Sequence, residues 1–383
     1  MTGPSLITRL EACGGRPSGF DYLRIALSVA VLCLHSVITS YGKAVDVEVW
    51  LSPMRPFERA ILPMFFALSG FLVAGSLMRC HTIVAFLGLR VIRIYPALAV
   101  EVLLSALILG PLLTTVPLST YFTATEFWLY LVNVTGHIHY TLPGVFADNP
   151  VPRVVNAQLW TVPYELLCYI ALSVLAVLGA VRRPWLAPAA AIGLTLAYGV
   201  GRFISHGGRL PVIVGGLPGY LLVVSFLLGV SLYLWGRYIP WNRSWFIVSL
   251  VLSLVTGSIL LVPGMQTISP YVDLFAPFPL AYLTVWLGLT DASKLFFVRR
   301  ADYSYGVYLY SYAIQQSVMA VAPWAREWWI NILICLPLSI LFAALSWHLV
   351  EKPAMGLKGR VKALEEAYLR WRRSAAPPRP AAH

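Results

Sequence analysis

Charged residues are scarce in this chain: only 11% of its 383 residues are Asp, Glu, Lys or Arg, whereas 59% are hydrophobic. A soluble domain carries about 25% charged residues, because its surface must face water. The excess of Leu, Val and Ile also excludes a disordered chain. The composition therefore predicts an all-α, polytopic membrane helix bundle. Residues 1–350 would form the transmembrane domain and residues 351–383 a basic cytoplasmic tail.

Several motifs that would indicate other chemistry are also missing. The sequence has no G-x-x-x-x-G-K-[ST] phosphate loop and no H-E-x-x-H or C-x-x-C pattern, so no metal site is expected. The five cysteines lie in apolar or cytoplasmic segments and are not expected to form disulfides. The N-terminus lacks the layout of a signal peptide, so the first apolar stretch is expected to remain as an anchor.

Ten apolar stretches are each long enough, at about 20 residues, to cross a bilayer. The eighth is the weakest, because Asp273, Pro277 and Pro279 interrupt it. The stretches are 24–41, 59–78, 94–113, 159–179, 185–203, 212–235, 244–262, 271–290, 303–322 and 328–349.

The 28 Lys and Arg residues are distributed unevenly between the two sides of these stretches. If the N-terminus is cytoplasmic, 21 of them fall on the inner side and 7 on the outer side. Positive residues concentrate on cytoplasmic loops, so the sequence predicts that both termini are cytoplasmic. The net charge of +12 is therefore interpreted as a topology signal, and no nucleic-acid partner is expected. The basic and apolar residues of the tail are typical of a helix on the anionic inner leaflet.

The first apolar stretch carries a polar stripe. Arg24 and His35 are eleven positions apart, which is three helical turns plus about 20°, so they share one face. Ser28 lies on the same stripe and Asp21 within a modest arc of it. His35 would lie about 16 Å along the axis from Arg24, near mid-membrane, where an ionisable side chain is costly and suggests function. The alternative is a neutral histidine hydrogen-bonded within the bundle.

Two further arginines lie at the inner surface. Arg90 and Arg93 are three positions apart and face the same way on a helix. They are either positive-inside anchors or a phosphate clamp that Arg24 could join, because guanidinium groups bind phosphate oxygens in a bidentate fork. Glu165 and Glu101 lie inside apolar stretches, where each could simply pair with an arginine of another helix.

Small and aromatic residues mark two other stretches. Ser69 and Gly70 lie in the middle of the second stretch and would permit close helix packing. The ninth stretch is crowded with tyrosines from Tyr303 to Tyr312, including Tyr305, which fits an aromatic belt combined with a protein core.

Six segments in order resemble the motifs of the acyltransferase 3 family of membrane O-acyltransferases, and they extend from residue 20 to residue 354. They are D-x-x-R with a following His (Asp21, Arg24, His35), F-F-x-x-S-G (Phe65, Phe66, Ser69, Gly70), R-x-x-R-I-x-P (Arg90, Arg93, Ile94, Pro96), L-W-[ST]-x-x-x-E (Leu159, Trp160, Thr161, Glu165), S-Y-x-x-Y-L (Ser304, Tyr305, Tyr308, Leu309) and E-K-P (Glu351, Lys352, Pro353). One departure is Tyr310-Ser311, where many members carry Trp-His. It weakens any mechanism that needs a second histidine there.

The resemblance implies transfer of an acyl group, usually acetyl, from cytoplasmic acyl-CoA (acetyl-CoA) to a hydroxyl of a saccharide or lipid-linked glycan. Such a protein would be a multi-pass enzyme of the bacterial inner membrane, with acyl-CoA as co-substrate and no permanently bound cofactor. The implied catalytic residues are His35 and Glu165. His35 would act as general base on the acceptor hydroxyl or carry the acyl group transiently. The implied donor- and substrate-binding residues are Arg24, Arg90, Arg93, Asp21, Ser69 and Tyr305.

Two other functions suit a polytopic bundle. A transporter or flippase of a glycan or small anionic solute would show broken spans at matched positions of two halves, and the sequence has no such symmetry. A different membrane acyltransferase fold with a His and an Asn as its polar pair is disfavoured by the place of His35 in the first stretch. Transfer of label from acyl-CoA to a glycan would distinguish an enzyme from a transporter.

Overall fold

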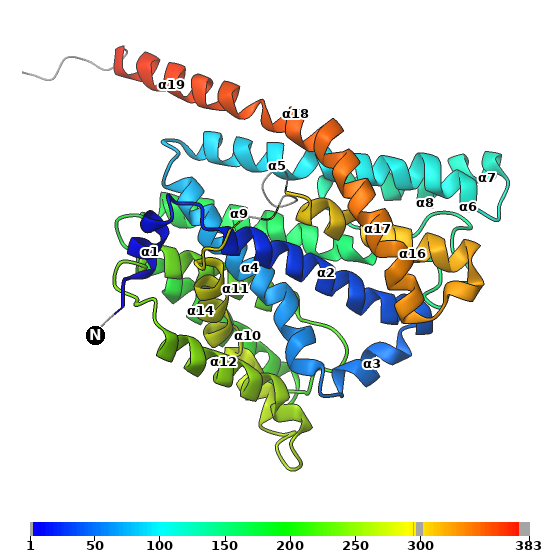
Figure 1. Cartoon of the computed structure of the whole chain (residues 1–383), viewed down its shortest axis with the longest axis horizontal. Coiled ribbons are helices and arrows are strands. Elements are labelled where there is room, and N and C mark those ends of the chain that lie inside the picture. Colours follow the sequence, from blue (N-terminus) through cyan, green and yellow to red (C-terminus); the bar gives the residue numbers. More distant parts are fainter. Residues whose placement is uncertain (1–2, 294, 296–301, 375–383) are drawn as a thin grey trace, which may run out of the picture.

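The computed structural model describes residues 3–293, 295 and 302–374, and over these residues the chain forms helices and no β-strand (Figure 1). This confirms the predicted all-α membrane bundle. Lys294, Arg299, Arg300 and Arg379 of the charge count, and the prolines that follow residue 375, lie outside the described residues. The longer helices are α2 (Ser18–Tyr41), α4 (Arg55–Leu77), α5 (Ile83–Leu104), α9 (Val162–Val177), α10 (Leu186–Ser205), α11 (Gly219–Leu234), α12 (Arg243–Ser258), α14 (Pro277–Gly288), α16 (Ser304–Val321), α17 (Trp328–Ser346) and α19 (Lys358–Ser374). The shorter helices are α1 (Leu6–Ala12), α3 (Ala44–Trp50), α6 (Gly110–Leu113), α7 (Leu118–Thr123), α8 (Thr125–Leu131), α13 (Ser269–Phe275) and α18 (Lys352–Met355).

Each of the ten predicted stretches overlaps at least one helix. Among the described residues, seven helical segments are long and apolar enough to cross a membrane. The stretches outside that set correspond to α11, which has only 16 residues, to the pair α13 and α14, which Ala276 separates, and to α16, which carries Gln315 and Gln316. The number ten therefore remains a prediction.

The short helix α11 lies in the interior of the bundle, with every residue from Leu221 to Ser231 buried. It packs on α4, α10 and α14. Glycines allow the closest approach: a Cβ added at Gly70 would collide with the carbonyl of Phe226, and one at Gly229 would collide with the carbonyl of Ala67. The packing role predicted for Gly70 is therefore confirmed, because α4 and α11 touch through their backbones.

The helix α5 begins earlier than predicted. The apolar stretch starts at residue 94, whereas the helix starts at Ile83, after the hydroxyl of Thr82 accepts a hydrogen bond from the Ala85 N–H at 3.1 Å. This cap is itself held by the tail, because Glu365 of α19 accepts hydrogen bonds from the backbone N–H groups of His81 (2.8 Å) and Thr82 (2.6 Å). The basic tail is thus packed on α5. Its contact with the inner leaflet remains a prediction.

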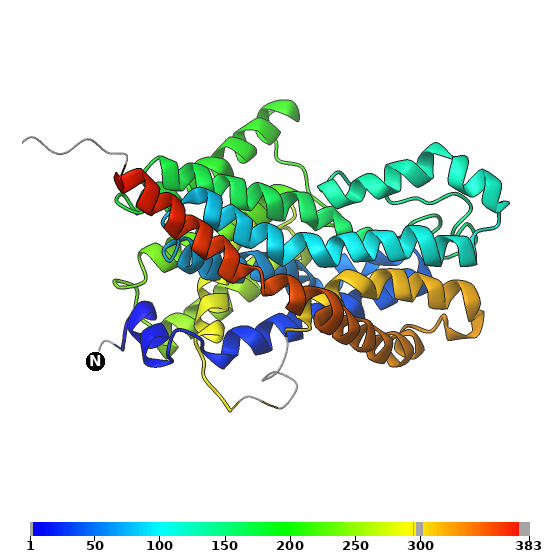
Figure 2. The same cartoon turned by 90° about the horizontal axis from the view of Figure 1, so that it is seen from above.

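The two ends of the described chain lie at the same end of the molecule. The N-terminus and the far end of α19 are both on the left in Figures 1 and 2, whereas α7 and α8 lie at the right. An even number of crossings requires this arrangement. It agrees with the predicted topology, in which both termini face the cytoplasm.

The predicted topology is testable with reporter fusions. Alkaline phosphatase fused after His383 is expected to be inactive, because that position would remain in the cytoplasm. The same enzyme inserted at Gly208, between α10 and α11, is expected to be active. Green fluorescent protein at the same positions should give the opposite pattern. Phosphatase activity at His383 would contradict the cytoplasmic C-terminus.

Candidate active site

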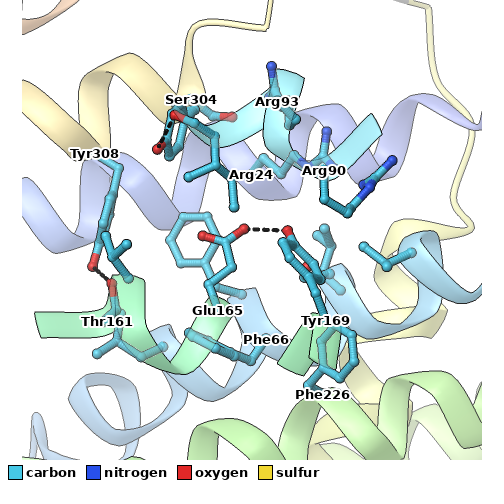
Figure 3. A pocket seen from close by; sticks show the side chains of 18 of the residues that line it. Arg24, Phe66, Arg90, Arg93, Thr161, Glu165, Tyr169, Phe226, Ser304 and Tyr308 are labelled. Atoms are coloured by element: carbon cyan, nitrogen blue, oxygen red, sulfur yellow. Dashed lines mark hydrogen bonds between the residues drawn. The ribbon is translucent and has the colours of Figure 1, made fainter. Parts of the chain in front are cut away.

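Six of the eight predicted site residues line one pocket, which we call the inner pocket and which measures about 150 Å³. It is formed by α2, α4, α5, α9 and α16, near the ends of α2 and α5 that face the tail. In Figure 3 the three arginines lie along one side of this pocket, and Glu165 lies near its centre. The six residues are Arg24, Ser69, Arg90, Arg93, Glu165 and Tyr305. Asp21 is not among the lining residues.

Two of the arginines are held by one carboxylate that the sequence analysis did not single out. Oδ2 of Asp302 accepts hydrogen bonds from Arg24 at 3.1 Å and from Arg93 at 2.5 Å, and Oδ1 accepts from the hydroxyl of Ser304. Arg93 also reaches Glu351 at 3.3 Å. Burial alone would raise the pKa of Asp302, but Arg93 and Arg24 outweigh it and lower the pKa to about 2. Asp302 therefore stays ionised at neutral pH.

Arg90 differs from its two neighbours, because it forms no ion pair with any described residue. Its guanidinium donates to the hydroxyl of Ser76 at 3.0 Å and lies near the rings of Phe86 and Tyr169. Lys358 of α19 interacts electrostatically with Arg90 and Arg93. The positive charge of Arg90 is therefore the one most available to an anionic ligand of the inner pocket.

The two buried glutamates do not pair with arginines as their positions suggested. Glu165 accepts a hydrogen bond from the hydroxyl of Tyr169 at 2.6 Å and forms no ion pair within the described part of the chain. Glu101 accepts hydrogen bonds from Ser105 (3.0 Å) and from the amide of Asn156 (2.8 Å). The expected arginine partner of Glu101 is thus wrong, because an amide from the outer segment 132–161 occupies that place.

His35 lies in a second pocket, which we call the outer pocket and which measures about 270 Å³. Leu62 and Tyr308 line both pockets, so these two side chains separate them. Arg24 and His35, predicted to share one face of α2, each line one of the two neighbouring pockets. The ring of His35 packs edge-on against Tyr312, with centroids 5.1 Å apart.

Gln158, which the sequence analysis missed, holds His35. Its side-chain amide is 3.1 Å from Nδ1 of His35 and 2.9 Å from the hydroxyl of Ser311, and Gln158 is completely buried. Ser311 stands where many members of the resembled family carry a histidine. The signal available in the sequence was a lone amide directly before the L-W-T motif, but nothing in the spacing places it against α2.

Tyr308 closes the boundary between the two pockets. Its hydroxyl is 2.7 Å from the hydroxyl of Thr161 and 3.1 Å from the carbonyl oxygen of Gln158. Figure 3 shows the Tyr308–Thr161 contact at the edge of the inner pocket. The ring of Phe65 packs against Tyr308 at 5.9 Å between centroids. The separation between the pockets is therefore made of side chains rather than backbone.

We expect Asp302→Asn to lower the thermal stability of the detergent-solubilised protein by a few degrees, because it leaves Arg24 and Arg93 without their shared counter-ion. All three groups are about a quarter exposed, so the loss should be about 1–2 kcal/mol rather than that of a fully buried pair. The pKa of Asp302 is lowered, so its contribution should be fully present above pH 4 and lost as the pH falls toward 2. Thermal unfolding followed by intrinsic fluorescence measures both effects.

The control is Asp148→Asn, which removes an exposed carboxylate at the opposite end and should leave the unfolding temperature unchanged. Equal unfolding temperatures for Asp302→Asn and the unmodified protein would show that the arginines do not depend on this carboxylate.

Comparison with known proteins agrees with this arrangement. Residues 18–348 match the acyltransferase 3 family, described as an acyltransferase domain. Nodulation protein 10 of Rhizobium leguminosarum bv. viciae is 28% identical over 375 residues, which cover 91% of this chain and 96% of that protein. An O-acetyl transferase of Shigella phage Sf6 is 24% identical over 337 residues, which cover 87% of this chain and 94% of that protein. No solved structure matches the chain. This family match covers most of the chain, including the helices that form both pockets. The chain therefore belongs to the acyltransferase 3 family, and the predicted resemblance is confirmed.

Proposed function

We propose that this protein transfers an acyl group, most simply acetyl, from cytoplasmic acyl-CoA to a hydroxyl of a saccharide or lipid-linked glycan, in the bacterial inner membrane. The observation that carries the proposal is the pair of pockets on either side of Leu62 and Tyr308. Arginines line the first and His35 lines the second. The similarity to a protein named O-acetyl transferase supports acetyl as the group and oxygen as the acceptor atom.

The inner pocket suits the donor because acyl-CoA carries several phosphate charges and cannot cross hydrocarbon. Arg90 forms no ion pair with a described residue, although Glu165 lies within electrostatic reach of it, and Lys358 extends the basic surface toward the tail. Arg24 and Arg93 are held by Asp302 and line the same pocket as Arg90. The phosphates would bind at this end, and the acyl-carrying arm would extend past Tyr305 and Glu165 toward Tyr308.

His35 supplies the group that activates the acceptor. Its imidazole takes the proton of the acceptor hydroxyl while that oxygen bonds to the thioester carbonyl carbon. The carbon–sulfur bond then breaks, and the leaving thiolate of CoA receives the proton. The alternative route, in which the imidazole first carries the acyl group, uses the same position.

Gln158 determines which nitrogen of His35 is free for this reaction. When its amide oxygen accepts from Nδ1–H, the lone pair of Nε2 is left for the hydroxyl proton. In the structure it is the amide nitrogen that lies 3.1 Å from Nδ1, so the amide donates to Nδ1 and the ring proton lies on Nε2; a 180° rotation of the amide converts this arrangement into the first. We assign the first arrangement to the active enzyme, because a general base needs an available lone pair.

The proposed activity is tested directly with purified protein, radiolabelled acetyl-CoA and a panel of oligosaccharides. Label should appear in a saccharide ester, with free CoA released in equal amount. Movement of a glycan across proteoliposomes with no ester formed would favour a transporter and contradict the proposal.

Replacement of His35 tests the catalytic assignment. Gln keeps a structural hydrogen bond but cannot accept a proton, so His35→Gln should lower turnover on the order of 10²-fold or more at an equal protein level. His35→Ala should abolish transfer. The control His206→Gln alters an exposed histidine after α10 and should leave turnover unchanged. Substantial activity in His35→Gln would move the general base to Glu165.

Replacement of Arg90 tests the donor site. Arg90→Gln should raise the KM for acyl-CoA about 10- to 100-fold, because a charge-assisted hydrogen bond to phosphate contributes about 1.5–3 kcal/mol. Expression should stay near normal, since Arg90 has no ion pair to lose among the residues that the structure describes. The control is Arg79→Gln, which removes an exposed charge from the segment between α4 and α5. An unchanged donor KM in Arg90→Gln would show that the arginine is an anchor rather than a phosphate ligand.

A further inference from the structure

The outer pocket contains two acidic side chains that the reaction described above does not use. Asp46 of α3 and Glu58 of α4 line it together with His35, Trp160 and Tyr308. The two carboxyl groups interact with each other electrostatically. Two neighbouring carboxylates repel each other, which favours one proton shared between them. The pair then holds a single negative charge.

Glu58, which lines this pocket, has spare hydrogen-bonding capacity. Its side chain is only 8% exposed, and within the described chain its Oε2 atom has no hydrogen-bond partner. A buried carboxylate oxygen without a donor is costly, since a carboxylate can accept several hydrogen bonds. A residue that lines the outer pocket thus has an oxygen atom, Oε2 of Glu58, that can still accept a hydrogen bond.

The two arginines that interact with Glu58 already have a counter-ion, Asp273. Arg55 and Arg59 both pair with Asp273 of α13, and both guanidinium groups lie over the ring of Trp50, at 5.5 and 5.8 Å. With Asp46, Glu58 and Asp273 ionised, the two arginines leave one negative charge in excess. One shared proton makes the cluster neutral, so it has no positive charge left for an anionic ligand.

We propose that Asp46 and Glu58 form the acceptor subsite and bind neighbouring hydroxyls of a neutral saccharide beside His35. This inference rests on the proposed acyl transfer to a glycan and adds the class of acceptor. Carboxylates accept two hydroxyl hydrogens at once, and the half-buried ring of Trp160 offers an apolar surface to the sugar ring. A uronic acid or another anionic sugar is disfavoured, because its charge would meet the carboxyl pair without a free cation.

The first part of the test uses the unmodified protein in detergent with labelled acetyl-CoA and matched pairs of oligosaccharides. Each pair contains a neutral chain and the same chain oxidised at C6 to the uronate. We expect kcat/KM for the neutral chain to exceed that for the uronate by at least tenfold. Equal or better transfer to the uronate would overturn the neutral-acceptor inference. No transfer to any saccharide would instead contradict the proposed function.

The second part uses the best acceptor of that panel and compares three variants. Glu58→Gln and Asp46→Asn should each raise the acceptor KM at least tenfold, with less than a twofold change in the KM for acetyl-CoA. In both variants the ratio of kcat/KM for the neutral chain to kcat/KM for the uronate should be smaller than in the unmodified protein. The matched control is Glu48→Gln, which removes an exposed carboxylate from the same helix α3 and should alter neither KM.

Folding of each variant is checked by its unfolding temperature and its elution in size-exclusion chromatography. If Glu58→Gln does not fold, the acceptor KM of Asp46→Asn tests the proposal instead, because the subsite needs both carboxyl groups. An acceptor KM within twofold of the unmodified value in a folded variant would overturn the proposal. An equal rise in both KM values would do the same, since it would indicate a general structural role.

Discussion

One carboxylate, Asp302, holds together segments that are far apart in the sequence. It binds Arg24 of α2 and Arg93 of α5 from a position directly before α16, and Arg93 in turn binds Glu351 after α17. Hydrocarbon offers no hydrogen bonds, so polar groups inside a bundle must find their partners within the protein. Arg24 and Arg93 line the inner pocket, and these carboxylates neutralise them there. The same pairing uses the charge of two arginines and leaves Arg90 for a ligand.

Much of the fold could be predicted from the sequence because the membrane imposes one length scale. Each predicted apolar stretch overlaps at least one helix. The start of α5 was missed because Arg90 and Arg93 interrupt the apolar pattern, although the helix continues through them from Ile83. The spanning criteria also fail for α11 and α16, which are largely buried by other helices and need no lipid-facing length.

The site was predicted in its residue types but not in its partnerships. Six candidates line one pocket, because their motifs lie on helices that meet at one end of the bundle. The groups that hold or complement them could not be deduced, since Asp302, Gln158 and Glu58 reach their partners only through tertiary packing. Glu101 illustrates the limit: its position in an apolar stretch indicated an arginine partner, yet Asn156 folds inward from the outer segment and satisfies it. Asp21 was placed with the donor site by its motif, and it does not line that pocket.

The two pockets differ in the charged groups that line them. In the inner pocket Arg90, with Lys358 nearby, forms no ion pair with a described residue, whereas the outer pocket is lined by the carboxyl groups of Asp46 and Glu58. The polyanionic donor that we propose would bind in the inner pocket, because the carboxyl pair of the outer pocket offers it no positive charge. Only its uncharged arm and acyl group suit the boundary at Tyr308. A neutral acceptor avoids both penalties in the outer pocket, where His35 lies next to that boundary. In the reaction that we propose, acyl transfer takes place at the boundary between the two pockets.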